Sequence, residues 1–173
     1  MSKTTVQFIL LGVILVLAQV IVFNHICLFN VAVPMVFIYL IVRLPITLSV
    51  NWLLTISFVL GLIVDMFSDT YGMNTLACTV LAMARKPILR LYVPREEDLP
   101  RPEPSMYTLG TASYLKYLLT MTLLYCALIF LIEAFTFFNP IRLLLLIVFS
   151  TILSMAIMVG IDSFMTPRSE KRL

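Results

Sequence analysis

Four acidic residues lie within or beside long apolar stretches, and they are the first candidates for chemistry in this sequence. They are Asp65, Asp69, Glu133 and Asp162. Asp65 and Asp69 are four residues apart, so a helix there would place both carboxylates on one face, where they could share a metal ion. An ionised Asp at the centre of a bilayer costs at least about 2.5 kcal/mol on insertion scales, so each acid in apolar surroundings needs an explanation.

Metal binding and catalysis find little further support among the residue patterns. Gly72 marks a turn close to Asp65 and Asp69, and no histidine or third acid lies near them. The single histidine, His25, lies in a short polar turn, where a solvated role is more common than a catalytic one. The sequence contains no Ser-His-Asp order, glycine-rich phosphate loop or HExxH motif. We therefore expect no enzyme activity, no bound metal and no cofactor.

The elements that position these acids are apolar enough to lie in a membrane. The 173 residues are 61% hydrophobic and 12% charged, with a mean hydropathy of +1.06, whereas a soluble domain is about one-quarter charged. A membrane-spanning helix needs about 20 apolar residues. We expect one all-α membrane domain over residues 1–173, with six transmembrane helices at about 6–23, 26–42, 50–66, 73–93, 114–135 and 141–165.

The second and fourth of these helices contain residues that disturb a simple span. Pro34 should kink the second helix unless neighbouring groups satisfy the carbonyl that loses its donor. The fourth apolar run is short, and we expect its helix to continue through Arg85 and Lys86 with a bend at Pro87. Both basic side chains would then reach the headgroup layer. A re-entrant segment is the alternative.

The basic residues indicate the orientation of the chain, because cytoplasmic loops retain Lys and Arg. Eleven of the twelve lie in alternate gaps between the apolar runs: Lys3, Arg43, Arg85, Lys86, Arg90, Arg95, Arg101, Lys116, Arg168, Lys171 and Arg172. We expect both termini and the loop 94–113 to be cytoplasmic, and the basic edge to attract anionic lipid, not nucleic acid. Four prolines among charges predict an extended, solvated loop, which is either a plain linker or a contact for cytoplasmic filament proteins.

This topology places three polar residues at similar depth near the outer surface. Asp65, Asn74 and Glu133 are either solvated or paired locally, or they line an outward-facing polar cleft that binds a partner. In the second interpretation Arg142 is a counter-ion of the acids. Asp162 lies near the inner surface.

Small and polar residues also occur at helix-packing spacings. Ser150 and Ser154 are four residues apart, and Gln19 lies inside the first apolar run. Small residues permit close approach of helices in lipid, and polar ones form hydrogen bonds across helices. We interpret them as packing groups within the bundle, with a partner interface as the alternative.

Several short stretches of the chain together resemble a known family. Arg43-Leu44-Pro45, Asn51-Trp52, the run from Gly61 through Asp65 to Ser68, and Tyr71-Gly72-Met73-Asn74 together resemble the rod shape-determining MreD family. Arg85-Lys86-Pro87 and the acidic, proline-containing loop are similar to the Bacteroidetes branch of that family. The resemblance extends over essentially the full length, including the number of crossings.

The resemblance implies a non-enzymatic scaffold in the bacterial inner membrane, within the cell-elongation machinery. Members of the family bind MreC, and through it MreB filaments and the RodA–penicillin-binding-protein synthase of peptidoglycan. Their fold is similar to the substrate-binding subunits of energy-coupling-factor (ECF) vitamin transporters. That similarity gives the alternative function, binding of a small ligand in an outward cleft near Asp65 and Glu133. The first helix, however, lacks the Ala-xxx-Ala surface that those subunits present to their transport partner.

Overall fold

The structure, a computed structural model, describes residues 3–22, 33–92, 103–133 and 140–165, and these residues form helices and no strand. The helices are α1 (Lys3–Ile21), α2 (Tyr39–Arg43), α3 (Val50–Ser68), α4 (Met73–Tyr92), α5 (Met106–Leu109), α6 (Thr111–Glu133) and α7 (Pro140–Met165).

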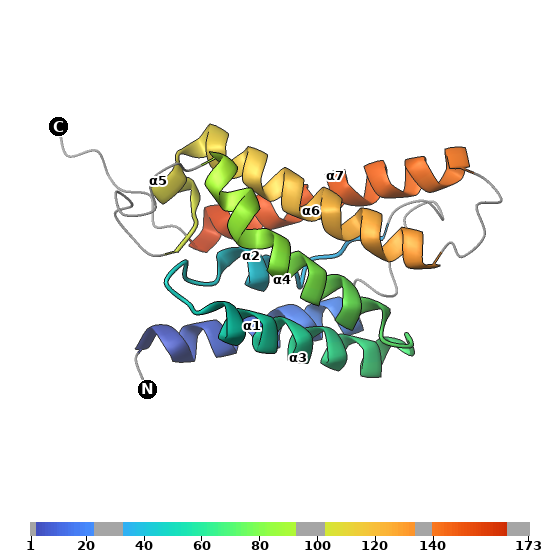
Figure 1. Cartoon of the computed structure of the whole chain (residues 1–173), viewed down its shortest axis with the longest axis horizontal. Coiled ribbons are helices and arrows are strands. Elements are labelled where there is room, and N and C mark those ends of the chain that lie inside the picture. The colour runs from blue at the N-terminus through green and yellow to red at the C-terminus, as the bar shows by residue number, and fades with distance from the viewer. Residues whose placement is uncertain (1–2, 23–32, 93–102, 134–139, 166–173) are drawn as a thin grey trace.

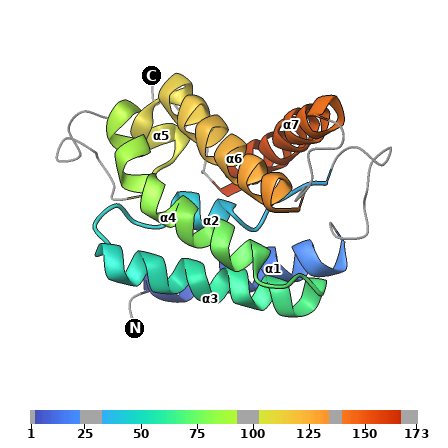
Figure 2. The ribbon, with the colours of Figure 1, turned by 45° about the vertical axis from the view of Figure 1, so that its right-hand side comes forward.

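The long helices run along the long axis of the molecule in two layers with α4 and α2 between them (Figure 1). Helices α1 and α3 form one layer, and α6 and α7 form the other, as the turned view in Figure 2 also shows. The most extensive contacts join α3 to α4, α4 to α6, and α6 to α7. The beginning of α1 and the end of α7 lie at the same end of the bundle, together with the end of α4.

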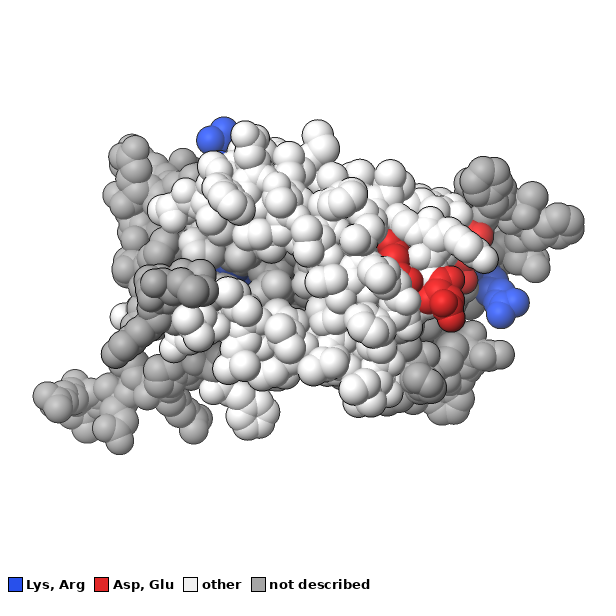
Figure 3. All heavy atoms as spheres, turned by 90° about the horizontal axis from the view of Figure 1, so that it is seen from below, with Lys and Arg blue, Asp and Glu red and all other residues white. Residues whose placement is uncertain are grey.

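Three of the helices are long and apolar enough to cross a membrane, so the chain is a membrane protein by composition and helix length. The three segments are Val50–Ser68, Thr111–Glu133 and Pro140–Phe164, and a shorter apolar segment covers Val6–Ile21 in α1. Their surfaces agree with a lipid environment. On the face drawn in Figure 3, uncharged side chains cover the middle of the molecule and acidic side chains gather toward one end. Helix α4, which we predicted at 73–93, is continuous through Pro87 but contains three basic residues, Arg85, Lys86 and Arg90.

The second predicted helix, 26–42, is wrong as a continuous span. Residues 33–36 have no helical structure, residues 37 and 38 form a turn, and α2 has only five residues. Residues 26–32 lie outside the described part of the chain. Pro34 is therefore part of an unwound segment inside the bundle, and not the site of a kink within a helix. We call residues 33–38 the unwound segment.

The inner loop predicted at 94–113 also needs correction over its second half. Ser105 caps the short helix α5 in a capping box with Thr108, and both residues are buried. Helix α6 begins at Thr111, after Gly110, whose φ of +79° is an ordinary conformation only for glycine. Residues 103–109 are thus folded against the bundle, because their polar groups are satisfied locally. Residues 94–102 lie outside the described residues.

Candidate functional site

The carboxylate of Asp65 lies at the centre of the first polar network. It accepts five hydrogen bonds at 2.5–3.0 Å, from the hydroxyls of Thr70 and Thr75, the side-chain amide of Asn74, and the backbone N–H groups of Asn74 and Thr75. The two N–H groups belong to the first turn of α4, where N–H groups have no acceptor within the helix itself. Asp65 therefore caps α4 from the end of α3, and its negative charge lies at the favourable end of the α4 dipole.

Two glycines and a left-handed residue give the chain the shape that this cap requires. A Cβ atom on Gly61 would lie 2.6 Å from Cα of Thr75 and 2.8 Å from the carbonyl oxygen of Asn74, so only glycine permits this approach of α3 to α4. Asp69 ends α3 at φ 51°, and Gly72 has φ +77°. We call Gly61–Thr75 the outer hairpin, after the side of the membrane on which the sequence predicts it. Gly61, Asp65, Gly72 and Asn74 belong to the stretches quoted above for the resemblance, and each has a defined structural role in this hairpin.

The outer hairpin is also tied to α6. The hydroxyl of Tyr125 donates to the side-chain oxygen of Asn74, and Tyr125 is completely buried. Asp65 is only 6% exposed. A carboxylate with five internal donors has little capacity left for an outside ligand, and so the network positions helices.

The structure brings two of the three predicted site residues together. Asp65 and Asn74 are hydrogen-bonded, whereas Glu133 is exposed at the end of α6. Among the described residues, no hydrogen bond or ion pair joins Glu133 or Arg142 to Asp65. Asp69 is exposed and ends α3 in a left-handed conformation, so it does not continue the helical face on which Asp65 lies. The described part of the chain contains no group of three or more potential metal-ligating side chains.

The second polar network holds the backbone of the unwound segment. Gln19 of α1 donates to the carbonyl oxygen of Pro34 at 3.0 Å and accepts from the N–H of Val36 at 2.8 Å. The hydroxyls of two serines of α7 accept from the segment on its other side: Ser150 from the N–H of Val33 at 3.0 Å, and Ser154 from the N–H of Met35 at 2.8 Å. Irregular backbone at membrane depth is tolerated only where it is buried in protein and satisfied, and these side chains supply that condition.

The third polar network surrounds α2. Arg43 lies 3.3 Å from a carboxylate oxygen of Asp162 and donates to the hydroxyl of Tyr39, which itself donates to Asp162 at 2.8 Å. Asp162 has no exposed surface. The guanidinium group of Arg43 is also 3.9 Å from a carboxylate oxygen of Glu103. Arg43 therefore connects α2 to α7 through Asp162 and to the segment before α5 through Glu103.

Arg85 has a different position from the one predicted. It does not extend to the headgroup layer, but is 2% exposed and donates to the backbone carbonyls of Val42 and Leu44 at the end of α2. The hydroxyl of Tyr117 also approaches the Val42 carbonyl, at 3.4 Å. A cation at the C-terminal end of a helix satisfies carbonyls that have no partner within the helix. Because α2 has only five residues, this contact supplies the capping that its own sequence lacks.

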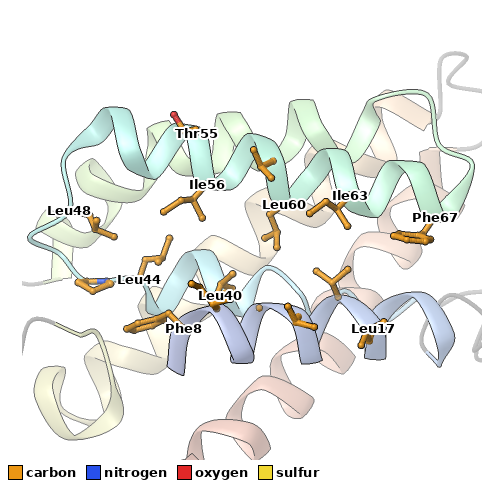
Figure 4. A pocket seen from close by; sticks show the side chains of 16 residues that line it. Phe8, Leu17, Leu40, Leu44, Leu48, Thr55, Ile56, Leu60, Ile63 and Phe67 are labelled. Carbon is orange, nitrogen blue, oxygen red and sulfur yellow. The ribbon is translucent and has the colours of Figure 1, made fainter. Parts of the chain in front are cut away.

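A cavity lies elsewhere, between α1 and α3, and we call it the α1–α3 groove. It has a volume of about 690 Å³ and is open on one side. Side chains from both helices point into it along its length, from Phe8 and Leu48 at one end to Leu17 and Phe67 at the other (Figure 4). Leu40 and Leu44 from the α2 region form its floor.

No family model, curated protein or solved structure matches this chain. The geometry of its own residues must therefore carry any functional conclusion. None of the three polar networks faces the groove.

Sequence reasoning found Asp65 and Asn74 but missed the purpose of several other polar residues. Ser150 and Ser154 are not merely small residues that allow close packing, since their hydroxyls accept hydrogen bonds from backbone. The pair of Arg43 and Asp162 was also missed. The signal for it was the expected topology, which places both residues near the inner surface with opposite charges.

Proposed function

We propose that this chain is a non-enzymatic scaffold of the bacterial inner membrane, of the MreD type, and that it binds MreC. The proposal includes six crossings with both termini in the cytoplasm. Through MreC the chain would be linked to MreB filaments and to the RodA–penicillin-binding-protein synthase of peptidoglycan.

The outer hairpin is the observation that supports this proposal best. The residues that carry the resemblance to MreD proteins build a rigid connection between α3 and α4, in which Asp65 accepts five hydrogen bonds. Polar residues that are fully committed to internal contacts preorganise a surface and do no chemistry themselves. A scaffold needs such a fixed surface, because a preorganised surface loses less entropy when a partner binds.

The proposed contact with MreC lies at the outer end of the bundle. Asp65 and Asn74 are buried, so their part is to hold the hairpin turn in place. The turn presents the side chain of Tyr71, which is 100% exposed, and Glu133 is exposed at the end of α6. Aromatic side chains on a rigid turn are effective contact residues because they cover a large area with few rotatable bonds.

The proposed topology has support from helix directions. The beginning of α1, the end of α4 and the end of α7 lie at one end of the molecule, while the outer hairpin lies at the other (Figure 1). Arg90 and Lys116 are on the first of these ends, by their places at the end of α4 and near the start of α6. Labelling of introduced cysteines from each side of the membrane tests the arrangement at Tyr71→Cys and Tyr107→Cys, two well-exposed positions. We expect a reagent added outside to label Tyr71→Cys and not Tyr107→Cys. Labelling of Tyr107→Cys from outside, or no labelling of Tyr71→Cys from outside, contradicts the topology.

Co-purification tests the partner. Tagged chain is extracted from membranes that also contain MreC, and the recovered MreC is quantified for the wild type, Glu133→Leu and the control Lys116→Leu at the opposite end. Loss of one partner of a desolvated charged contact costs about 2–5 kcal/mol, or at least about 30-fold in affinity. We expect reduced recovery for Glu133→Leu only. Absence of MreC from the wild-type preparation contradicts the function, whereas equal recovery from all three contradicts only the location.

The alternative function, small-ligand binding as in ECF transporter subunits, has no specific observation in its favour. A site for a polar vitamin needs a few convergent polar groups. The α1–α3 groove is apolar along its length, with Thr55 as its single polar lining residue.

A further inference from the structure

The α1–α3 groove has a chemistry that selects its occupant. Among the described residues that line the groove, Thr55 is the only one with a polar side chain. Its hydroxyl donates to the carbonyl oxygen of Asn51, one turn earlier in α3, at 2.9 Å. The described lining of the groove therefore offers a ligand no free side-chain donor and no charge of either sign. An occupant that matches such a surface is itself uncharged and has no groups that need hydrogen bonds.

We propose that the α1–α3 groove binds an acyl chain of a membrane phospholipid. This site goes beyond the scaffold function, and it meets the outer hairpin only at Ile63 and Phe67, toward one end of the groove. The hydrocarbon chain lies between α1 and α3, and the headgroup stays in the interfacial layer.

The size of the groove favours an acyl chain over a protein partner. Its volume of about 690 Å³ falls within the range of about 300–1,000 Å³ typical of sites that hold one small ligand. A helix with its side chains is about 10–12 Å across. A stable contact between two proteins buries about 800 Å² on each partner, and the surface inside the groove is well under half of that.

The shape of the groove agrees with the direction of lipid chains. The lining residues that belong to α3 extend from Thr55 to Phe67, a distance of about 18 Å at 1.5 Å per residue. The hydrocarbon core of a bilayer is about 30 Å thick, so the acyl chains of one leaflet fill about 15 Å of it. The groove follows α3 over this length (Figure 4), so a chain lying in it has the same direction as the chains around it. Gly12 of α1 makes room for the side chain of Leu40 in the floor of the groove, because a Cβ atom on residue 12 would lie 2.9 Å from Cδ2 of Leu40.

A groove-filling substitution provides the test, with a matched substitution outside the groove as its control. Val59 lines the groove and is 45% exposed, whereas Val148 of α7 does not line it and is 46% exposed. Wild type, Val59→Trp and Val148→Trp are purified in mild detergent with added phosphatidylethanolamine, and bound phospholipid is quantified by native mass spectrometry. We expect one retained phospholipid in the wild type and in Val148→Trp, and at least a fivefold loss in Val59→Trp.

Several outcomes contradict the proposal. Equal retention by all three proteins indicates lipid bound without regard to the groove, and no retention by the wild type indicates no site. A dimer that Val59→Trp abolishes assigns the groove to a second copy of the chain, and a co-purified protein that it releases assigns the groove to a partner helix. If Val59→Trp does not fold, Val13→Trp fills the groove from the α1 side, since Val13 also lines it and is 51% exposed. Retention by a folded Val13→Trp at the wild-type level then overturns the proposal.

Discussion

Replacing Asp65 with Asn keeps the size of the side chain and removes one acceptor atom and the charge. The carboxylate now accepts three hydrogen bonds at Oδ1 and two at Oδ2, the latter from the N–H and hydroxyl of Thr75. If the Asn oxygen keeps the larger set, its NH₂ group faces the N–H of Thr75. The hydroxyl of Thr75 can rotate to accept, but its backbone N–H cannot.

The cost follows from that one orphaned donor and from the charge. A buried donor without a partner costs about 1–3 kcal/mol. Loss of the negative charge at the beginning of α4 adds about 0.3–1 kcal/mol. We therefore expect Asp65→Asn to lower the free energy of unfolding by about 1–4 kcal/mol.

The chain contains its own control for this experiment. Asp69→Asn is the same chemical change four residues later, at an exposed position whose left-handed backbone Asn also tolerates. It should change stability by no more than about 0.5 kcal/mol. Reversible unfolding of both variants in mixed detergent micelles measures the difference. Equal stability of Asp65→Asn and wild type refutes the capping role, and an equal loss in both variants refutes the assignment to Asp65.

Three further substitutions test the other buried contacts by the same unfolding measurement. Gly61→Ala should destabilise the protein by more than about 2 kcal/mol, because the added Cβ atom meets backbone atoms of α4. Gly160→Ala should be neutral or stabilising, because a Cβ atom there meets nothing within 4 Å. Equal effects of the two substitutions contradict the close approach of α3 to α4. Gln19→Leu should lower the free energy of unfolding by about 2–4 kcal/mol, because it leaves the carbonyl of Pro34 and the N–H of Val36 without partners, whereas the exposed Gln7→Leu should not lower it. A Gln19→Leu protein as stable as the wild type contradicts the role of Gln19 in holding the unwound segment. Arg85→Met should cost at least about 2 kcal/mol through loss of the α2 cap, and a wild-type stability would place the side chain at the headgroups after all.

Sequence patterns predicted the helices whose determinants are local. The limits of α3, α4, α6 and α7 follow from apolar runs and from a nearby turn signal, Gly72, and the observed bounds lie within three residues of those predicted. The outer hairpin could be predicted for the same reason, since Asp65 and Thr75 are only ten residues apart in the sequence. Its internal hydrogen bonding was not, because an apolar run with one Asp is equally compatible with a solvated acid.

The unwound segment could not be predicted from its own residues. Its composition is apolar and typical of a spanning helix, apart from Pro34. What makes the irregular backbone stable is supplied by Ser150 and Ser154, which are 117 and 119 residues away from the groups they accept from. Arg43 and Asp162 are likewise 119 residues apart. Periodicity and turn chemistry contain no information about such distant partners.

The dependence of the unwound segment on α7 has a consequence for biogenesis. Chains are synthesised from the N-terminus, so residues 33–38 leave the ribosome long before Ser150 and Ser154 exist. Until α7 is in place, the N–H groups of Val33 and Met35 need water or the insertion machinery as temporary partners. Integration of the early part of the protein is therefore completed only when α7 is in place. In a chain that stops before α7, the N–H groups of Val33 and Met35 lose the acceptors that satisfy them here.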